Sequence, residues 1–299
     1  MRKPITTVLA GVALAAGAAP LAAQEGGSTR EVLGRILDVI LGPDKQPQAE
    51  REDTAAPAME TVLAAPVRDE DRARDVWRHP AQTLAFFQVE PGQTVVDYMP
   101  AGGWYTRILV PYLGPQGLYI GLTPDPAAAD NEGSENYFAG LPGKFREAAP
   151  GWGLTGAPMA IYGSQDLPAE LKGQVDRVLI FREMHNLLRS GVMYTELTRI
   201  RDLLKPGGMV GVVQHRAKAD APADYTLGQN GYLREADVVG LMRAHGFRLV
   251  SSSEINANPR DTADHSGGVW EIAPSLGTKR EELRSIGESD RMTLLFAKA

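Results

Sequence analysis

The chain has 299 residues, of which 43% are hydrophobic and 23% charged, and its formal net charge at pH 7 is −6. These values are ordinary for a globular protein, and an acidic chain without a basic block is a poor partner for nucleic acid. The sequence contains no cysteine, which excludes disulfides, thiolate catalysis and cysteine-based zinc sites.

The N-terminus is typical of a secretory signal peptide. A basic start, Met1 to Lys3, is followed by an apolar run over residues 5–19, and small residues lead to a cleavage point after Ala23. The alternative is an uncleaved N-terminal anchor. Residues 1–23 are therefore predicted to be a signal peptide, and the mature chain an exported, periplasmic protein. No later stretch is apolar for long enough to span a bilayer, so no transmembrane span is predicted in the mature chain.

Residues 24–60 are predicted to form a helix and a linker ahead of a main domain at 61–299. Between Ser28 and Leu41, apolar residues recur at the spacing of an amphipathic helix. This helix either docks on a membrane or a partner, or packs on the surface of its own domain. From 44 to 59 the sequence becomes polar and rich in proline and alanine, as linkers are.

The main domain alternates helix-like and strand-like segments. The ranges predicted as helices are 68–77, 81–87, 105–113, 135–139, 194–204 and 233–245. The ranges predicted as strands are 94–98, 117–122, 158–162, 175–181, 209–213, 247–253 and 292–297. A Lys205-Pro206-Gly207-Gly208 turn is expected to end the fifth of these helices. Strands separated by helices predict an α/β protein with a doubly wound, mostly parallel sheet, and the closing pair of strands is expected to be antiparallel.

The stretch from Thr94 to Tyr105, T-V-V-D-Y-M-P-A-G-G-W-Y, carries the clearest functional pattern. A β-branched strand ends in an acid, Asp97, and a turn of small residues, Pro100-Ala101-Gly102-Gly103, leads into a helix. Glycine lets the backbone approach a ligand closely, the start of a helix offers free N–H groups, and an acid can hold a ribose or an amine. This order is typical of a nucleotide-type pocket.

Ligands of open parallel sheets bind outside the carboxyl ends of the strands. Polar residues follow the parallel strands here in greater density than helix capping alone requires, although a single Asp after a strand can equally be an N-cap. The candidate site residues are therefore those that follow the strands: Asp97, Pro100, Ala101, Gly102, Gly103, Thr123, Asp125, Ser164, Gln165, Asp166, Phe181, Arg182, Glu183, His185, Asn186, Gln214, His215 and Arg216.

His185 and His215 should lie on neighbouring strands, where they could share a metal ion or act as acid and base. No third convincing ligand accompanies them, so no metal is predicted. The sequence lacks the phosphate-loop, H-E-x-x-H and G-x-S-x-G motifs, which disfavours the hydrolases that use them. A hydrolase or metal-assisted enzyme built on His185, His215 and His265 is an alternative hypothesis.

A long loop from Asn256 to Gly268 follows the sixth predicted strand. It carries Arg260, Asp261, Asp264 and His265. Two interpretations fit this composition equally: a cover over the pocket, and a solvated surface loop.

From residue 81 to the C-terminus, the order of these pieces resembles the class I S-adenosylmethionine-dependent methyltransferases. The shared features are the first strand with its acid and small-residue turn, L-K-P-G-G before the fifth strand, and the final antiparallel strand. More narrowly, the chain resembles a group of exported bacterial "predicted methyltransferases". The stretches that carry this narrower resemblance are V-V-D-Y-M-P-A-G-G-W-Y-T-R-I-L-V-P-Y-L-G, F-R-E-M-H-N, S-S-E-I-N-A-N-P-R-D and G-E-S-D-R-M-T-L.

The resemblance implies a seven-stranded Rossmann-like sheet that binds S-adenosylmethionine across its first three strands. The turn from Pro100 to Gly103 would face the methionine part of the cofactor, and Asp97 would organise the turn or meet the amine. Asp125 is the candidate for the ribose hydroxyls, and Gln165 or Asp166 for the adenine edge. Phe181 to Glu183 would line the reaction side.

Methyl transfer requires an in-line approach of the nucleophile, and a base if the acceptor is protonated. Glu183, His185 and His215 are the candidates for that base. The expected acceptor is a small molecule or a component of the cell envelope, and the sequence specifies no oligomeric state.

The chain departs from the superfamily pattern in two places. Met99 and Ala101 stand where the superfamily has the first two of three spaced glycines, and only Gly103 matches. Thr123 closes the second strand, where the ribose acid is usual, and Asp125 comes two residues later. These departures, with the predicted export, motivate a second hypothesis: a non-enzymatic ligand-binding or interaction protein on a methyltransferase fold.

Overall fold

The computed structural model describes Gly34 and residues 55–299. The predicted signal peptide, almost all of the predicted helix from Ser28 to Leu41 and most of the predicted linker lie outside the described residues. Helix α2 (Met59–Ala64) spans the predicted domain boundary at residue 61. Its Val62 is buried in the core, and Met59, on the other side of the boundary, packs against the same cluster. The residues just before the predicted boundary therefore pack on the domain itself.

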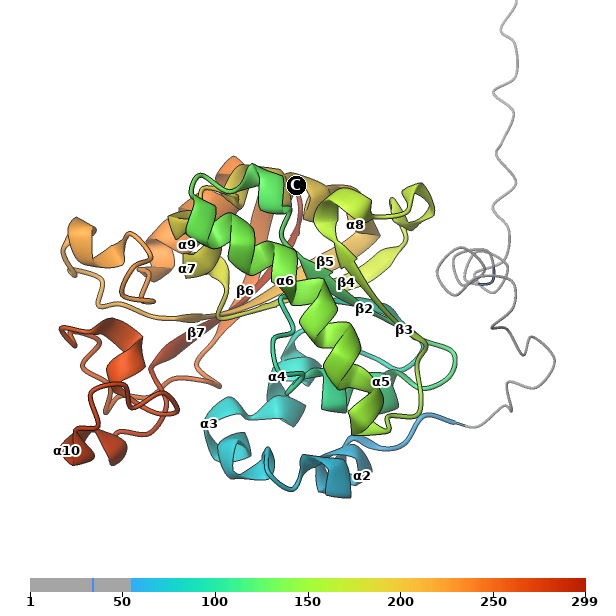
Figure 1. Cartoon of the computed structure of the whole chain (residues 1–299), viewed down its shortest axis with the longest axis horizontal. Coiled ribbons are helices and arrows are strands. Elements are labelled where there is room, and N and C mark those ends of the chain that lie inside the picture. Colours follow the sequence, from blue (N-terminus) through green and yellow to red (C-terminus); the bar gives the residue numbers. More distant parts are fainter. Residues whose placement is uncertain (1–33, 35–54) are drawn as a thin grey trace, which may run out of the picture.

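A single seven-stranded sheet runs through the middle of the domain (Figure 1). Its strands, in chain order, are β1 (Thr94–Tyr98), β2 (Leu118–Thr123), β3 (Met159–Gly163), β4 (Val175–Phe181), β5 (Leu204–His215), β6 (Phe247–Ser253) and β7 (Arg291–Lys298). The order across the sheet is β3-β2-β1-β4-β5-β7-β6. Strands β1 to β5 pair in parallel, whereas β7 is antiparallel to both β5 and β6. The predicted fold class is confirmed.

The order of the strands reverses between β1 and β4, because the chain continues outward through β2 and β3 and then returns to the other side of β1. This reversal is the topological switch point, where open α/β sheets bind their ligands. Every residue of β1 and β2 is buried. Their continuous apolar runs suit strands that are covered on both faces by helices.

Helices cover the two faces of the sheet. The remaining α-helices are α3 (Asp75–Arg78), α4 (Pro80–Phe86), α5 (Thr106–Leu113), α6 (Glu132–Ala148), α7 (Met184–Arg189), α8 (Met193–Leu203), α9 (Glu235–Ala244) and α10 (Glu281–Arg284). Side chains of α4 and α5 belong to one buried cluster, and side chains of α7, α8 and α9 to the other. No helix in residues 55–299 combines the length and the apolar character that crossing a bilayer would take.

Helix α6 is much longer than the predicted segment at 135–139, which was wrong in extent because three glycines and Pro142 disguise the helix. Asn131 caps it by accepting a hydrogen bond from the Ser134 amide at 2.8 Å. Phe138 and Phe145 are buried in different clusters, one on each side of the sheet. Helix α6 therefore crosses from one face to the other, in front of the sheet in Figure 1.

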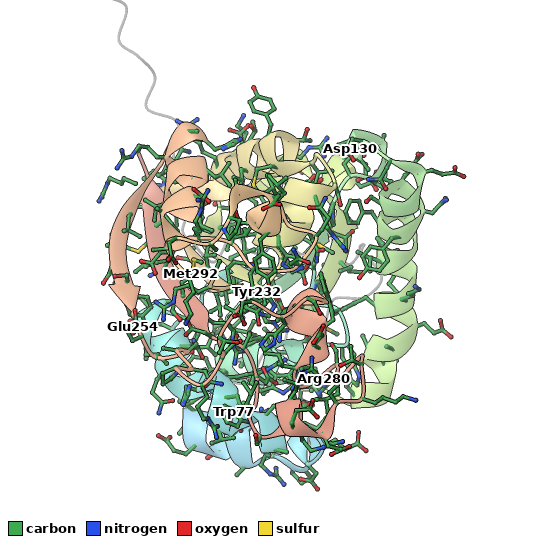
Figure 2. The ribbon with its side chains drawn as sticks, turned by 90° about the vertical axis from the view of Figure 1, so that its left-hand side faces the viewer. Trp77, Asp130, Tyr232, Glu254, Arg280 and Met292 are labelled. Carbon is green, nitrogen blue, oxygen red and sulfur yellow. The ribbon has the colours of Figure 1, made fainter. Side chains whose placement is uncertain are left out.

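The predicted charge-rich helix at 68–77 is also wrong. The chain forms two 3-10 turns, at 66–68 and 72–74, followed by the short helix α3. The reason is that the charges bond across the fold instead of along a helix: Asp71 accepts from Arg107, and Arg74 donates to Glu288. Figure 2 looks onto this side of the molecule, where Trp77 lies beside the C-terminal segment that carries Arg280.

Two smaller expectations need correction. Lys205 to Gly208 is not a free turn but the start of β5, with a register irregularity opposite the beginning of β4. The sequence analysis predicts no helix where α7 lies, directly after β4, because it assigns the polar residues of this segment to the end of the strand.

Candidate functional site at the carboxyl edge of the sheet

The turn after β1 keeps a glycine-type backbone although two of its key positions are not glycine. Met99, Ala101 and Gly103 all have positive φ angles, of 54°, 48° and 75°. Such angles disfavour residues with a Cβ atom by roughly 1–2 kcal/mol each. The Met99 amide donates to the Leu122 carbonyl at 2.7 Å, which ties the turn to β2. The chain therefore departs from the superfamily pattern in its residue types only, and the backbone of the turn remains left-handed at these positions.

Gly103 has a packing role in this turn. A Cβ atom at this position would lie 2.4 Å from the ring of Trp152, which follows α6. Only glycine therefore lets the Trp152 segment close onto the turn. Gly103 itself lines neither of the two cavities that flank the turn.

The first cavity, called here the α6 cavity, lies between the turn and α6 and has a volume of about 330 Å³. Its walls are mainly apolar, with Lys144 as its only lysine or arginine. The lining residues are Met99, Pro100, Ala101, Gly102, Thr123, Tyr137, Leu141, Lys144, Phe145, Ala148 and Glu183. Its volume is at the lower end of the range for small-molecule sites.

The second cavity, called here the arginine cavity, lies on the side of the turn that faces residues 71–78 and has a volume of about 210 Å³. Its lining residues are Asp71, Arg74, Arg78, Asp97, Met99, Pro100, Ala101, Gly102, Trp104, Tyr105, Arg107, Phe181, Arg182 and Glu183. Both cavities are lined by Glu183 and by Met99, Pro100, Ala101 and Gly102. The two cavities therefore adjoin at Glu183 and the turn.

Asp97 is buried at the end of β1, with 2% of its surface exposed. Burial raises the pKa of its carboxyl from 3.8 to about 7, although the hydrogen bond from the Tyr119 hydroxyl, at 3.0 Å, acts in the opposite direction. The Tyr119 hydroxyl is also bonded to Thr106, at 2.8 Å. Asp97 is thus fixed in place and changes its charge near neutral pH.

We expect the variant Asp97→Asn to be more stable than the wild type at pH 8, by about 4 kcal/mol at most, since the pKa rises from 3.8 to about 7 and one pKa unit corresponds to about 1.4 kcal/mol. The folded-state pKa is raised, so the folded protein binds the proton more tightly. The resulting stability is full below about pH 3.8 and is lost as the pH rises through about 7. Urea unfolding between pH 5 and 8 measures the difference, which should shrink toward low pH. Parallel pH profiles for the two proteins would contradict this prediction.

Glu183 occupies the border between the two cavities, directly after β4. The Asn186 side chain donates a hydrogen bond to its carboxylate at 2.5 Å. Burial raises the pKa of Glu183 from 4.5 to about 7, while the bond from Asn186 opposes this shift. A carboxylate with a pKa near the working pH is suited to act as a general base.

His185 and His215 lie close to each other but away from both cavities. Their rings are 5.7 Å apart, and Trp270 and Tyr232 pack against them. Burial lowers the pKa of His185 to about 4 and that of His215 well below its usual value. Both imidazoles are therefore neutral at pH 7. The His215 ring contacts the Ser289 hydroxyl at 2.6 Å.

His265, the third histidine of the hydrolase hypothesis, is bonded to Asp261 at 2.9 Å. The ring of Tyr232 lies between His215 and His265, with centroids 6.1 and 6.5 Å from theirs. Among the residues that the structure describes, no three His, Cys, Asp or Glu side chains are grouped as metal ligands.

The residues predicted to hold ribose and adenine lie outside both cavities. The Asp125 carboxylate caps a 3-10 turn by accepting from the Ala127 amide at 3.0 Å and forms an ion pair with Arg199 at 2.9 Å. Gln165 and Asp166 are exposed and bonded to each other at 2.8 Å. Of the predicted residues, the structure brings together around the two cavities Asp97, the turn from Pro100 to Gly102, Thr123, Phe181, Arg182 and Glu183.

Sequence reasoning missed the residues that close the two cavities from outside the strand ends. Tyr137 and Lys144 come from α6, Arg74 from the predicted helix at 68–77, and Arg78 from the residue that follows it. The available signal was the pair of arginines four residues apart.

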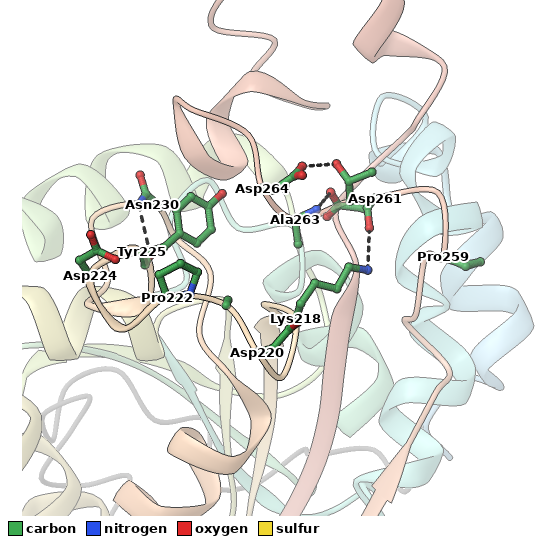
Figure 3. A pocket seen from close by; sticks show the side chains of 12 residues that line it. Lys218, Asp220, Pro222, Asp224, Tyr225, Asn230, Pro259, Asp261, Ala263 and Asp264 are labelled. Atoms are coloured by element: carbon green, nitrogen blue, oxygen red, sulfur yellow. Dashed lines mark hydrogen bonds between the residues drawn. The ribbon is translucent and has the colours of Figure 1, made fainter.

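A larger cavity, of about 810 Å³, lies elsewhere (Figure 3). The loop after β5 and the loop from Asn256 to Gly268 form its walls, so the latter loop lines this cavity and neither of the cavities at the turn. Its most buried acid, Asp261, accepts from Tyr232, Ala263 and Asp290. Internal hydrogen bonds therefore occupy that carboxylate.

No protein-family model matches the chain, and no curated protein matches it in sequence. Solved structures do resemble it. The [4+2]-cyclase SpnF is 14% identical, with 91% of this chain and 94% of that chain covered and a TM-score of 0.50. A SAM-dependent methyltransferase from Aquifex aeolicus is 17% identical, with 67% and 94% covered and a TM-score of 0.45. The mitomycin 7-O-methyltransferase MmcR is 15% identical, with 81% and 61% covered and a TM-score of 0.45. At such identities the likeness shows the fold alone.

Proposed function

We propose that this protein is an S-adenosylmethionine-dependent methyltransferase that acts, after export to the periplasm, on a small molecule or an envelope component. One observation carries the proposal: the left-handed turn after β1 separates two adjoining cavities that share Glu183. A methyl transfer needs two binding sites that meet at one point, one for the methyl donor and one for the acceptor.

The α6 cavity fits the cofactor. Leu141 and Phe145 offer apolar surface to an adenine ring, the turn offers a closely approachable backbone, and Lys144 can pair with a carboxylate. When bound, the cofactor supplies an electrophilic methyl group. Asp125 does not line this cavity, so a role for it at the ribose would require release of its ion pair with Arg199.

Glu183 is the proposed base among the three candidates. It lines both cavities, and its raised pKa of about 7 allows the carboxylate to take a proton from a hydroxyl or amine acceptor. His185 and His215 line neither cavity. Their proposed role is to pack the region behind β4 and β5, together with Trp270 and Tyr232.

A second candidate function is binding, or chemistry other than methyl transfer, on the same fold. The observation that favours it is the engagement of Asp125 by Arg199, which leaves the expected ribose ligand occupied. One protein with a similar fold is described as a [4+2]-cyclase, and a fold does not determine a reaction. Mass spectrometry of ligand that copurifies with the protein separates the two candidates, because S-adenosylhomocysteine would argue against the second.

Titration calorimetry of the chain with S-adenosylmethionine and S-adenosylhomocysteine tests the proposed function. We expect the wild type to bind both, and Leu141→Trp to weaken both by about 10-fold or more, because the larger side chain fills part of the α6 cavity. Glu147→Trp is the matched control, since Glu147 is exposed on α6 and lines neither cavity.

Two results would count against the proposal in different ways. No heat with the wild type at millimolar ligand would remove the methyltransferase function. Equal affinities in Leu141→Trp and the wild type would move the cofactor out of the α6 cavity.

A further inference from the structure

Among the described residues, Arg182 is an arginine that forms no ion pair, at the switch point of the sheet. It follows β4 directly, adopts a left-handed backbone with φ 64°, and donates its amide to the Val213 carbonyl at 2.6 Å. Left-handed φ angles in residues other than glycine, asparagine and aspartate are uncommon and cluster at functional sites. The half-buried side chain lines the arginine cavity, and within residues 55–299 its guanidinium makes no hydrogen bond or ion pair.

The neighbouring arginines already occupy two of the carboxylates near Arg182, those of Asp71 and Glu288. Arg107 is paired with Asp71 through two hydrogen bonds, of 2.6 and 2.8 Å. Arg74, Arg78 and Arg291 share the single carboxylate of Glu288, at 2.6, 3.1 and 3.1 Å.

The pKa values of these groups reflect the shortage of negative charge. Burial, and next to it the charge of Arg182, lowers the pKa of Arg78. The two other acids of the cavity, Asp97 and Glu183, both have pKa values of about 7, so each is only partly ionised at neutral pH. Positive charge is therefore in excess at this cavity.

One wall of the arginine cavity is aromatic. The rings of Tyr105 and Phe181 are stacked with their centroids 3.5 Å apart, and the Arg78 guanidinium lies over the ring of Trp104 at 4.7 Å. A cavity with a cationic group and an aromatic wall suits a molecule that has an anionic group and a flat or apolar body. Its volume of about 210 Å³ limits that molecule to a small one.

We propose that the arginine cavity binds the methyl acceptor through an anionic group, a carboxylate or a phosphate, and that Arg182 is the residue that pairs with it. The identification of the ligand as an acceptor rests on the proposed function. The acceptor is thus a small organic anion, held beside Glu183.

The cofactor has a carboxylate of its own, which is the other possible source of the anion. The structure favours the acceptor because the α6 cavity contains Lys144 as a separate cation for the cofactor. Only the arginine cavity contains Arg182, and only Glu183 among the side chains outside the turn touches both cavities.

Calorimetry of the full chain, saturated with S-adenosylhomocysteine, tests this inference with benzoate, phenyl phosphate and the uncharged benzamide. We expect one or both anions to bind and benzamide not to bind. Arg182→Gln should weaken anion binding by about 10-fold or more, the effect of losing a charge-assisted hydrogen bond, and Arg182→Lys should restore part of it. Arg248→Gln, an exposed arginine on β6, is the matched control and should bind as the wild type does.

The affinity for S-adenosylhomocysteine should not change in Arg182→Gln. A contrary result would be a fall in the affinity of Arg182→Gln for S-adenosylhomocysteine with no fall in its affinity for 5′-methylthioadenosine, which lacks the amino-acid part. In that case the arginine cavity holds the cofactor carboxylate, and the acceptor assignment is overturned. Failure of both anions to bind the wild type also overturns the inference. Anion binding that depends on Arg182 in a protein that binds no S-adenosylhomocysteine would keep the anion site and remove the methyltransferase function.

Discussion

Replacement of Glu288 by alanine is expected to lower the free energy of unfolding by about 3–5 kcal/mol, the usual cost of removing one partner from a buried ion-pair cluster. Glu288 is buried and, among residues 55–299, is the only carboxylate that pairs with Arg74, Arg78 and Arg291. Without it, at least two buried guanidinium groups lose their counter-ion. Urea unfolding of the variant and the wild type at pH 7 measures the loss.

Glu282→Ala is the control for Glu288→Ala, because Glu282 pairs with Arg280 in the same segment but at the surface. The free energy of unfolding should fall far less in Glu282→Ala than in Glu288→Ala. Sulfate should restore part of the stability of Glu288→Ala by replacing the missing anion. A Glu288→Ala variant as stable as Glu282→Ala would show that the arginines do not depend on this carboxylate.

Acid should weaken the same cluster. Burial raises the pKa of Glu288, but Arg78, Arg291 and Arg74 outweigh it and bring the pKa down to about 2 from 4.5. A group whose pKa is lowered on folding contributes stability above its unfolded pKa and loses it as the pH falls through the folded value. The difference between Glu288→Ala and the wild type should therefore diminish between pH 4.5 and 2.

Replacement of Glu196 by alanine is expected to cost a similar amount, about 3–4 kcal/mol, because it leaves several buried polar groups without a partner. The Glu196 carboxylate, on α8, accepts from the Tyr98 hydroxyl at 3.0 Å, the Ser164 hydroxyl at 2.6 Å and the Asp125 amide at 3.2 Å. These three partners follow or end three different strands. Glu196 thus joins the carboxyl ends of β1, β2 and β3.

Asp202→Ala is the matched control for Glu196→Ala. Asp202 lies on the same helix and pairs with Lys172, but both side chains are exposed. We expect thermal and urea unfolding to show a small effect for Asp202→Ala and a large one for Glu196→Ala. Equal effects would mean that water replaces Glu196 at the strand ends without cost.

The sequence was sufficient to predict the sheet and the turn of the candidate site. Strands such as β1 and β4 contain short apolar runs, V-V and V-L-I-F, and their alternation with helices leaves few topologies open. Asp97, Phe181 and Glu183 could be placed together because they end, or directly follow, two adjacent parallel strands. That reasoning depends only on the order of the segments along the chain.

The sequence could not reveal which contacts each polar side chain makes. Asp125 and Glu183 both follow strands, yet Asp125 pairs with Arg199 and Glu183 borders two cavities. The partner of Arg78, Glu288, is 210 residues away in the chain. Because charged segments usually face water, Arg78 carried no sign that it is buried.

The arginine cavity has one wall that the sheet does not provide. Asp71, Arg74 and Arg78 come before residue 81, and Glu288, which pairs with Arg74 and Arg78, comes from the far end of the chain. A shortened chain that starts at residue 81 would keep all seven strands and the turn but would lose this wall. Under the proposed function, segments outside the sheet would then help to select the molecule that binds in the arginine cavity, and a truncated form would test the α6 cavity alone.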